Sequence, residues 1–313
     1  MGKTIRSPDD AMTEGSLRRF ACTSCGRCCD GGPEMELGEA TALAGTFITR
    51  VIFKIHSLPL YETGRRAALW RDAQKSELPT RQALAEMREH LARFSVRDET
   101  DRARGRSLHL TISAVAVDLE SARCPAMRGN LCGIYNARPL TCRTVPLHYS
   151  HPLSALAGHL DEFVAKPGHA CNVDGVAPAV LRDQTILDEA VRASRAAAYD
   201  IQVVDDAWKR EIVTAMADAE TAAAAGLPTH EVVQRNSDRG VASAVSMLAA
   251  WRIARRLGVL SIDAFERVCG DQTRLITGAL AGQWSPSISG DLHAMLLEYE
   301  IENSAEKHYP LGL

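Results

Sequence analysis

The sequence lacks the features of several common protein classes. Aromatic residues make up only 5% of the 313 residues, and no apolar run approaches the length of a membrane span. The first fifteen residues are polar and charged, without the apolar segment of a secretory signal. The formal net charge is -3, so no general excess of positive charge favours nucleic acid. We therefore expect a cytoplasmic protein without a membrane partner, and the composition gives no evidence for nucleic-acid binding.

Widespread catalytic and nucleotide-binding motifs are absent as well. No GxGxxG follows a predicted strand, and the chain has no Walker A loop, no GxSxG and no HExxH. The hydrophobic fraction of 46% and the charged fraction of 24% are those of an ordinary globular protein. The length suits about two domains. Composition therefore bounds the class of protein but does not indicate its chemistry.

The cysteines carry the strongest signal in the chain. Eight of the nine lie in two groups, and only Cys269 stands apart, where we interpret it as a core residue. The first group is the run Cys22-Thr23-Ser24-Cys25-Gly26-Arg27-Cys28-Cys29, and the second comprises Cys124, Cys132, Cys142 and Cys171. In a reducing compartment, clustered cysteines are more often metal ligands or catalytic thiols than structural disulfides. We therefore interpret the two groups as metal ligands, with a disulfide framework as the alternative.

The spacing of the first run suits thiolate coordination. A C-x2-C step lets two thiolates converge on one metal, because the intervening turn points both sulfurs inward. Cys28 continues the same step, as in ferredoxin-type ligation, whose fourth ligand comes from elsewhere in the chain. Adjacent side chains diverge, so Cys28 and Cys29 suggest two neighbouring sites, or one site and a spare thiol. If there are two sites, the remaining thiols suffice to complete both, so we expect all eight to converge.

The identity of the metal is left open by the ligand type, since thiolates suit both zinc and iron. Structural zinc sites usually pair two C-x2-C knuckles, whereas here one run is followed by single cysteines. The spacing therefore favours iron–sulfur clusters, with zinc or another mononuclear metal and redox thiols as alternatives. Nearby arginines would offset the thiolate charge, and they are Arg27, Arg123, Arg128, Arg138 and Arg143. The nearby histidines His148, His151 and His169 are interpreted as ordinary surface or loop residues.

Periodicity gives a partial map of the region between the cysteine groups. Apolar residues at helical spacing predict helices over 38–56 and about 84–94, and the polar segment 61–77 is expected to be partly helical. The charged segment 98–106 is expected to be a solvent-facing loop. Residues 107–117 give the best strand signal in the chain. Further on, the turn around Gly129 is expected to place Cys124 and Cys132 on opposing arms of a hairpin.

The remainder of the chain is rich in alanine and shows no strand signal. Helices are predicted over 180–200, 206–225, 238–257, 262–281 and 291–306. Gly226 and Gly258 are expected to end helices, Ser237 and Ser261 to begin them, and Asp205-Asp206 to act as a cap.

These patterns predict a mainly α protein in two parts. Residues 18–175 would form a cysteine-cluster metal-binding domain with a small β element and inserted helices at about 39–95. Residues 176–313 would form an α-helical bundle that packs on this domain.

The cysteine segments resemble a known family. The pattern Phe20-x-Cys22-x2-Cys25-Gly26-x-Cys28-Cys29, followed by Cys124-Pro125, Cys132-x-Ile134-Tyr135 and Arg138-Pro139-x2-Cys142-Arg143, is similar to the CxxCxxCC domain, a family named for zinc or iron chelation. These are the YkgJ-type cysteine-cluster proteins, and the fit extends to Cys171. The resemblance covers about 18–175, and the segment between Asp30 and Arg123 is longer than compact members need.

The resemblance implies metal or cluster binding at the eight matching cysteines. The family's motif is similar to that of flagellin lysine N-methylase, which implies methyl transfer from S-adenosylmethionine to a lysine of a protein substrate. Three hypotheses follow: an iron–sulfur protein of undefined redox or modifying activity, a lysine N-methyltransferase that uses the cluster, and a zinc-stabilised adaptor without catalytic activity. The sequence does not decide whether the protein is an enzyme.

Overall fold

The computed structural model describes residues 16–29, 31–60, 81–119 and 123–308. Helices account for about 50% of the described residues and strands for 19%. Helical residues therefore predominate as predicted, but the sheet is larger than the single small β element that the sequence indicated. The predicted leader up to residue 15 and the segment 61–77 lie outside the described residues.

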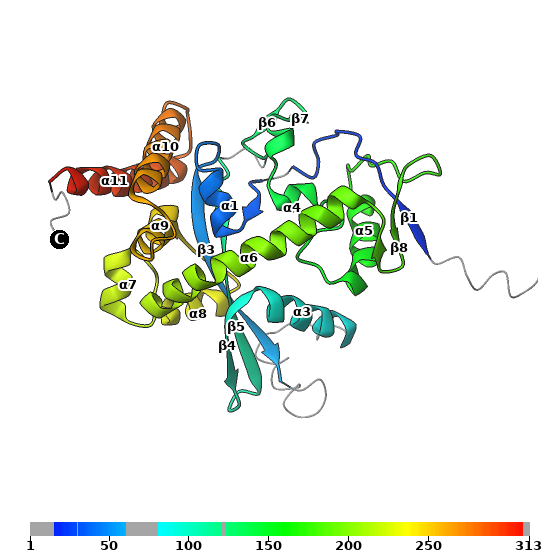
Figure 1. The fold of residues 1–313 in the computed structure, drawn as a ribbon, viewed down its shortest axis with the longest axis horizontal. Coiled ribbons are helices and arrows are strands. Elements are labelled where there is room, and N and C mark those ends of the chain that lie inside the picture. Colours follow the sequence, from blue (N-terminus) through cyan, green and yellow to red (C-terminus); the bar gives the residue numbers. More distant parts are fainter. Residues whose placement is uncertain (1–15, 30, 61–80, 120–122, 309–313) are drawn as a thin grey trace, which may run out of the picture.

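A five-stranded antiparallel sheet lies at the centre of the fold (Figure 1). Its two long strands are β3 (Thr49–Pro59) and β5 (Arg106–Ala116), which pair along their whole length. The short strand β10 (Ser243–Ser246) extends the sheet on the β3 side. On the other side, β5 pairs with both β2 (Glu34–Met35) and β4 (Ser95–Asp101). The strand predicted at 107–117 is confirmed as β5.

The helix predicted over 38–56 is wrong for most of its length. Only α1 (Leu37–Ala42) is helical, and the chain then turns into β3. The apolar residues of this stretch fit a helical period, but many of them are β-branched or aromatic, and such side chains favour a strand. Val51 and Phe53 are fully buried on one face, while Lys54 between Phe53 and Ile55 is exposed. Pairing with β5 therefore decides the structure here.

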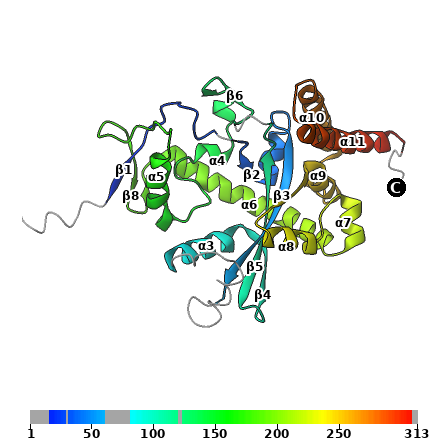
Figure 2. The ribbon, with the colours of Figure 1, turned by 180° about the vertical axis from the view of Figure 1, so that it is seen from behind.

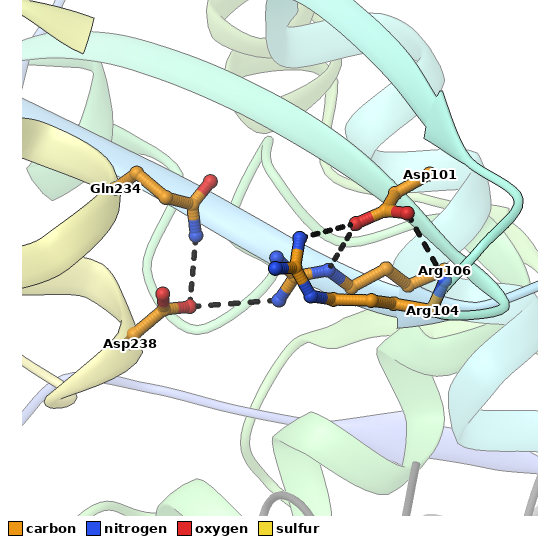
Figure 3. A network of polar contacts seen from close by, with 5 residues as sticks. All are labelled: Asp101, Arg104, Arg106, Gln234 and Asp238. Atoms are coloured by element: carbon orange, nitrogen blue, oxygen red, sulfur yellow. Dashed lines mark hydrogen bonds and ion pairs between the residues drawn. The ribbon is translucent and has the colours of Figure 1, made fainter. Parts of the chain in front are cut away.

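The loop predicted over 98–106 is largely the hairpin between β4 and β5. Its charged residues are paired with one another and with helix α8 (His230–Asp238) (Figure 3). Asp101 accepts hydrogen bonds from the backbone and guanidinium of Arg104, both at 3.0 Å. Arg106 contacts Asp101 and forms an ion pair with Asp238 at 3.6 Å. A charged segment with such local partners is stable as a hairpin, which the composition alone did not show.

The second half of the chain contains strands that were not predicted. Strand β1 (Leu17–Arg19) pairs with β8 (Ala179–Arg182), and β8 pairs with β9 (Thr185–Ile186). The helices expected over 180–200 and 206–225 are replaced by the single long helix α6 (Glu189–Met216) and the short α7 (Ala219–Ala225). α6 begins at Asp188, whose side chain accepts a hydrogen bond from Val191. It runs from the β1–β8 sheet to α7 and α8 (Figures 1 and 2).

The other helices agree more closely with the sequence pattern. The predicted helices near 84–94, 262–281 and 291–306 are confirmed. The helix expected over 238–257 is present only in its second half, as α9, and strand β10 precedes it where the first half was predicted to be helical. The remaining bounds are α3 (Arg81–Phe94), α4 (Leu140–Arg143), α5 (Leu156–Ala165), α9 (Met247–Arg256), α10 (Ile262–Leu280) and α11 (Pro286–His308).

Three of the predicted caps are confirmed. Ser261 caps α10, and Gly226 and Gly258 end helices with φ of +75° and +71°. Ser237 and the pair Asp205-Asp206 are instead internal to helices. Ser237 accepts a hydrogen bond from the amide of Ile55 and Asp205 from that of Gly38, so these two serve tertiary contacts, whereas Asp206 pairs with Arg210 on the same helix.

One large hydrophobic core joins the sheet to the helices that follow it. Val51, Phe53 and Ile112 from the sheet share this core with Trp208 of α6 and Trp251 of α9, all buried to at least 98%. The indole of Trp208 donates a 2.9 Å hydrogen bond to the carbonyl of Ala250, which satisfies its buried polar group. Cys269 is also fully buried in this core, as expected of a residue that is not a ligand.

Candidate metal centre

All eight clustered cysteines line one cavity of about 620 Å³. They come from four segments that are distant in sequence: the run 22–29, the β6–β7 hairpin with the residues before it, α4, and the loop before β8. Apolar side chains complete the wall, among them Phe47, Met127 and Ile134. None of the nine cysteines forms a disulfide, so the alternative of a disulfide framework is not formed in this structure.

The run 22–29 is held by backbone pairing with the segment that carries Cys171. Ala21 and Asn172 exchange two backbone hydrogen bonds, of 2.7 and 3.0 Å, in an isolated antiparallel bridge. The hydroxyl of Thr23 donates to the carbonyl of Ala170 at 2.8 Å. Within the run, Ser24 and Gly26 adopt φ of +57° and +71°. These turns change the chain direction between consecutive cysteines, as a C-x2-C ligand pair requires.

The second group is joined to the end of the same run. The amide of Cys124 donates a 2.8 Å hydrogen bond to the carbonyl of Cys29. The hairpin of β6 (Met127–Arg128) and β7 (Leu131–Cys132) follows, with Gly129 at φ +61° in its turn. The predicted hairpin is therefore present, with Cys132 on β7 and Cys124 just before β6.

Cys142 is positioned by the one-turn helix α4, which begins after Pro139. No side chain at the cap position bonds to this helix. Instead, the carboxylate of Glu39 on α1 accepts a 2.6 Å hydrogen bond from the amide of Leu140. Glu39 was missed by sequence reasoning, because it lies 101 residues before Leu140 in the sequence and only the tertiary fold brings the two together.

The pKa shifts show which thiols lie near one another. A hydrogen bond with Cys28 and then burial raise the pKa of the Cys29 thiol far above its usual range, and the charges of Cys142 and Cys124 raise it further. Burial, followed by the charges of Cys124 and Cys132, raises the pKa of Cys142 to about 12. Cys29, Cys124, Cys132 and Cys142 therefore make up one set of interacting thiols.

The other thiols form a second set around the loop before β8. Burial raises the pKa of Cys171, and the neighbouring charges of Cys25, Cys22 and Cys28 add to this effect. Hydrogen bonds with the backbone at Arg27 and Ala170 lower the pKa of Cys25. Cys28 belongs to this set and also interacts with Cys29, so the adjacent pair joins the two sets.

The donor set fits a thiophilic metal. Thiolates that raise one another's pKa are unfavourable together without a cation, and a bound metal supplies that positive charge. Within the described parts of the chain, no three histidine, cysteine or acidic side chains are arranged closely enough to hold a metal ion as they stand. The thiols share a cavity without a closed coordination shell, and the assignment of all eight as ligands stays a prediction.

Of the predicted arginines, Arg138 lines this cavity, and several of the others lie on the same segments as the cysteines and bond to backbone carbonyls. Arg123 donates to the carbonyl of Gly129 at 2.8 Å, Arg138 to that of Tyr135 at 3.0 Å, and Arg143 to that of Arg138 at 2.6 Å. No acidic residue occurs between residues 123 and 143. These cations fix the local backbone and also leave positive charge beside the thiols.

The three histidines near the cysteines in sequence do not all lie at the cysteine cavity. His169 lines the cysteine cavity, and its Nδ1 is buried without a hydrogen-bond partner in the described structure. His148 and His151 line a different cavity. Both lie in a loop, which the interpretation as surface or loop residues allowed, but they are half-buried, and burial is the largest cause of the lowered pKa of each ring.

Comparison with known proteins supports the metal centre. Residues 21–172 match the CxxCxxCC family, described as a "Putative zinc- or iron-chelating domain". This match agrees with the family that the cysteine motif indicated, and the family's description is consistent with metal binding. Neither the curated proteins nor the solved structures contain a significant match to the chain. None of the described helices is long and apolar enough to cross a membrane.

Proposed function

We propose that the CxxCxxCC domain holds two metal centres, each with four thiolate ligands. One would use Cys22, Cys25, Cys28 and Cys171, and the other Cys29, Cys124, Cys132 and Cys142. The observation that carries this proposal is that all eight thiols line one cavity. The effects of Cys124 and Cys132 on the pKa of Cys142, and of Cys25, Cys22 and Cys28 on the pKa of Cys171, support the division between two centres. The thiols of Cys28 and Cys29 contact each other, so this pair would lie where the two centres meet, with one ligand belonging to each.

We assign iron–sulfur clusters to these centres in preference to zinc. The run of three thiols at three-residue steps with a distant fourth ligand is the ferredoxin type of arrangement. When bound, such clusters supply electron transfer or substrate activation at iron. The protein's own residues would set the local polarity, through the apolar wall and through arginines that offset thiolate charge. A reducing compartment such as the cytoplasm would keep the ligands available.

The decisive experiment is analysis of iron, zinc and acid-labile sulfide in protein purified without oxygen. Iron and sulfide in comparable amounts, with a brown absorbance shoulder, would support the proposal. Zinc without sulfide would instead support a zinc-stabilised adaptor. The variants Cys25→Ser and Cys142→Ser should each lower bound metal, whereas Cys269→Ala should not.

Lysine N-methylation remains the alternative activity implied by the resemblance. It needs S-adenosylmethionine and a protein substrate in addition to the metal centres. Equilibrium dialysis of the metal-loaded protein against labelled S-adenosylmethionine tests this separately. Binding that is lost in the Cys142→Ser variant would favour the methyltransferase, and the absence of binding would leave a redox or other modifying role as the proposal.

A further inference from the structure

A second cavity of about 640 Å³ lies beside the cysteine cavity. Five of the chain's ten histidines line it. They are His56 of β3, His90 of α3, His148 and His151 of the loop after α4, and His159 of α5. Glu34 and Thr141 line both cavities, so the two lie next to each other. Half of the histidines in one cavity is a concentration that core packing does not require.

The floor of this cavity is the polar face of the central sheet. Lys54 pairs with Thr111, and Ile52 pairs with Ser113, in the register of β3 and β5. These residues alternate with the buried apolar residues of the same strands, so their side chains point away from the main core. Helix α3 and the 148–152 segment supply the rest of the wall. Other segments therefore cover this polar face of the sheet but leave a cavity between themselves and the strands.

Hydrogen bonds fix the protons on two of the histidines. The hydroxyl of Thr111 donates to the carbonyl of Lys54 at 3.2 Å, so it must accept its 3.1 Å bond from Nε2–H of His56. This leaves Nδ1 of His56 as an acceptor. His90 donates from Nδ1 to the carbonyl of Ser150 at 2.7 Å, which leaves its Nε2 as an acceptor.

The cavity also has an excess of negative charge. Ser113 donates to one oxygen of Glu34 at 2.5 Å, and Gln82 donates to one oxygen of Glu86 at 2.9 Å. Each of these bonds occupies one carboxylate oxygen only. The third carboxylate, Glu36, is neutralised by its buried ion pair with Lys209. The two carboxylates of Glu34 and Glu86 therefore face one further cation, Lys54.

Burial keeps three of the imidazoles neutral, which preserves their acceptor character. It lowers the pKa of His56 and His148 to about 4 and that of His151 to about 3. The aromatic rings of Phe94 and Tyr149 also line the cavity, and ring faces attract cations. The lining therefore offers acceptors, negative charge and ring faces, and it suits a ligand that donates hydrogen bonds and carries positive charge.

The size of the cavity decides between an ion and an organic cation. Ligand cavities of about 300–1,000 Å³ suit small organic molecules, and this one is far larger than a metal ion needs. Among the residues that the structure describes, no three histidine, cysteine or acidic side chains at this cavity are arranged so that they could hold a metal ion. We propose that this cavity binds the protonated amine of an organic ligand, with Glu86 and Glu34 as its charged partners. The bound amine would then lie beside the cysteine cavity.

The test uses the full-length protein as purified and three probes of similar shape: n-butylammonium, n-butanol and butyrate. Imidazole ¹⁵N NMR follows the acceptor nitrogens of His56 and His90. We expect n-butylammonium to shift these signals with saturation, n-butanol to do so at least tenfold more weakly, and butyrate to have no effect. Equal responses to the amine and the alcohol, or no response to any probe, would overturn the proposal.

Two variants on the same helix give the matched comparison. Glu86→Gln removes a carboxylate that lines the cavity, whereas Glu89→Gln removes an exposed one that pairs with Arg93. We expect at least a fivefold loss of n-butylammonium affinity in the first variant and no change in the second, with equal melting temperatures. Equal affinities in both variants would show that the carboxylate does not bind the amine. The readout is independent of metal content, so failure here leaves the metal proposal intact.

Discussion

The carboxylate of Glu39 on α1 accepts a 2.6 Å hydrogen bond from the amide of Leu140, the first residue of α4. α1 is in turn held by α6, because Asp205 accepts a 2.9 Å hydrogen bond from the amide of Gly38. Carboxylates at helix N-termini satisfy free amides and favour the helix dipole. Two such contacts in series connect the long helix α6 to α4 and hence to Cys142.

The first prediction concerns Glu39. Replacing it with alanine removes the side-chain acceptor at the start of α4, so we expect a loss of about 1 kcal/mol, as for other helix N-caps. Bound metal should fall as well, because Cys142 would be less well positioned. Glu39→Gln keeps an acceptor oxygen and should be milder. Urea unfolding and metal analysis of the two variants check this, and equal losses in both would contradict it.

The second prediction compares two neighbouring cations on α6. Lys209 and Glu36 form an ion pair whose side chains are each 5% exposed, whereas Arg210 pairs with Asp206 at 2.6 Å on the exposed surface. Breaking a buried pair leaves an uncompensated charge, so Lys209→Met should cost about 3–5 kcal/mol of unfolding free energy. Arg210→Met should change it by less than about 1 kcal/mol.

A double variant checks the cause of that cost. If the buried charge of Glu36 is responsible, Glu36→Gln combined with Lys209→Met should recover much of the stability lost in Lys209→Met alone. Urea unfolding of the single and double variants measures the recovery. Additive losses in the double variant would mean that the ion pair is not the reason.

Several helices and strands could be predicted from the sequence, and the wrong predictions have physical reasons. The strand at 107–117 and the helix at 262–281 were predictable, because one alternates cleanly and the other has an N-cap at Ser261. β3 was mistaken for a helix, because its apolar residues fit both periods and the pairing with β5 decided between them. Short strands such as β8 and β9 have too few residues for a periodic signal.

The candidate site was predictable to the extent that its chemistry is carried by one residue type. Eight cysteines are visible in the sequence, and their gathering in one cavity agrees with the expected convergence. The contact between Glu39 and Leu140 has no sequence signal. The histidine cavity was also missed, because its residues come from β3, α3, α5 and a loop that only the tertiary fold brings together.

The third prediction concerns acid sensitivity. The pKa values of His56, His148 and His151 are lowered by burial, to about 4, 4 and 3. In the unfolded chain these three histidines bind protons below about pH 6.5, whereas in the folded chain the same three rings stay neutral until the pH approaches their lowered pKa values. The unfolded state thus gains protons first, so stability is full above about pH 6.5 and falls as the pH drops toward 4. The slope is at most about 1.4 kcal/mol per pH unit for each histidine.

Comparison of variants isolates this effect from the acidic groups. His151→Gln should reduce the loss of urea stability between pH 7 and pH 5, relative to the unsubstituted protein. His293→Gln, which removes an exposed histidine of α11, is the control for loss of an imidazole. If His151→Gln and His293→Gln show the same pH dependence as the unsubstituted protein, burial of the His151 ring is not the cause of acid sensitivity.

The division of the thiols between two centres is tested most directly by metal content in paired cysteine variants. Cys28→Ser and Cys29→Ser should each lose about half of the metal, because each removes one ligand of a different four-thiolate centre. Adding Cys22→Ser to Cys28→Ser should cause no further loss, since both belong to one set, whereas adding it to Cys29→Ser should abolish metal binding. If Cys28→Ser alone removes all metal, or if both double variants retain the same amount, the two-centre account is wrong.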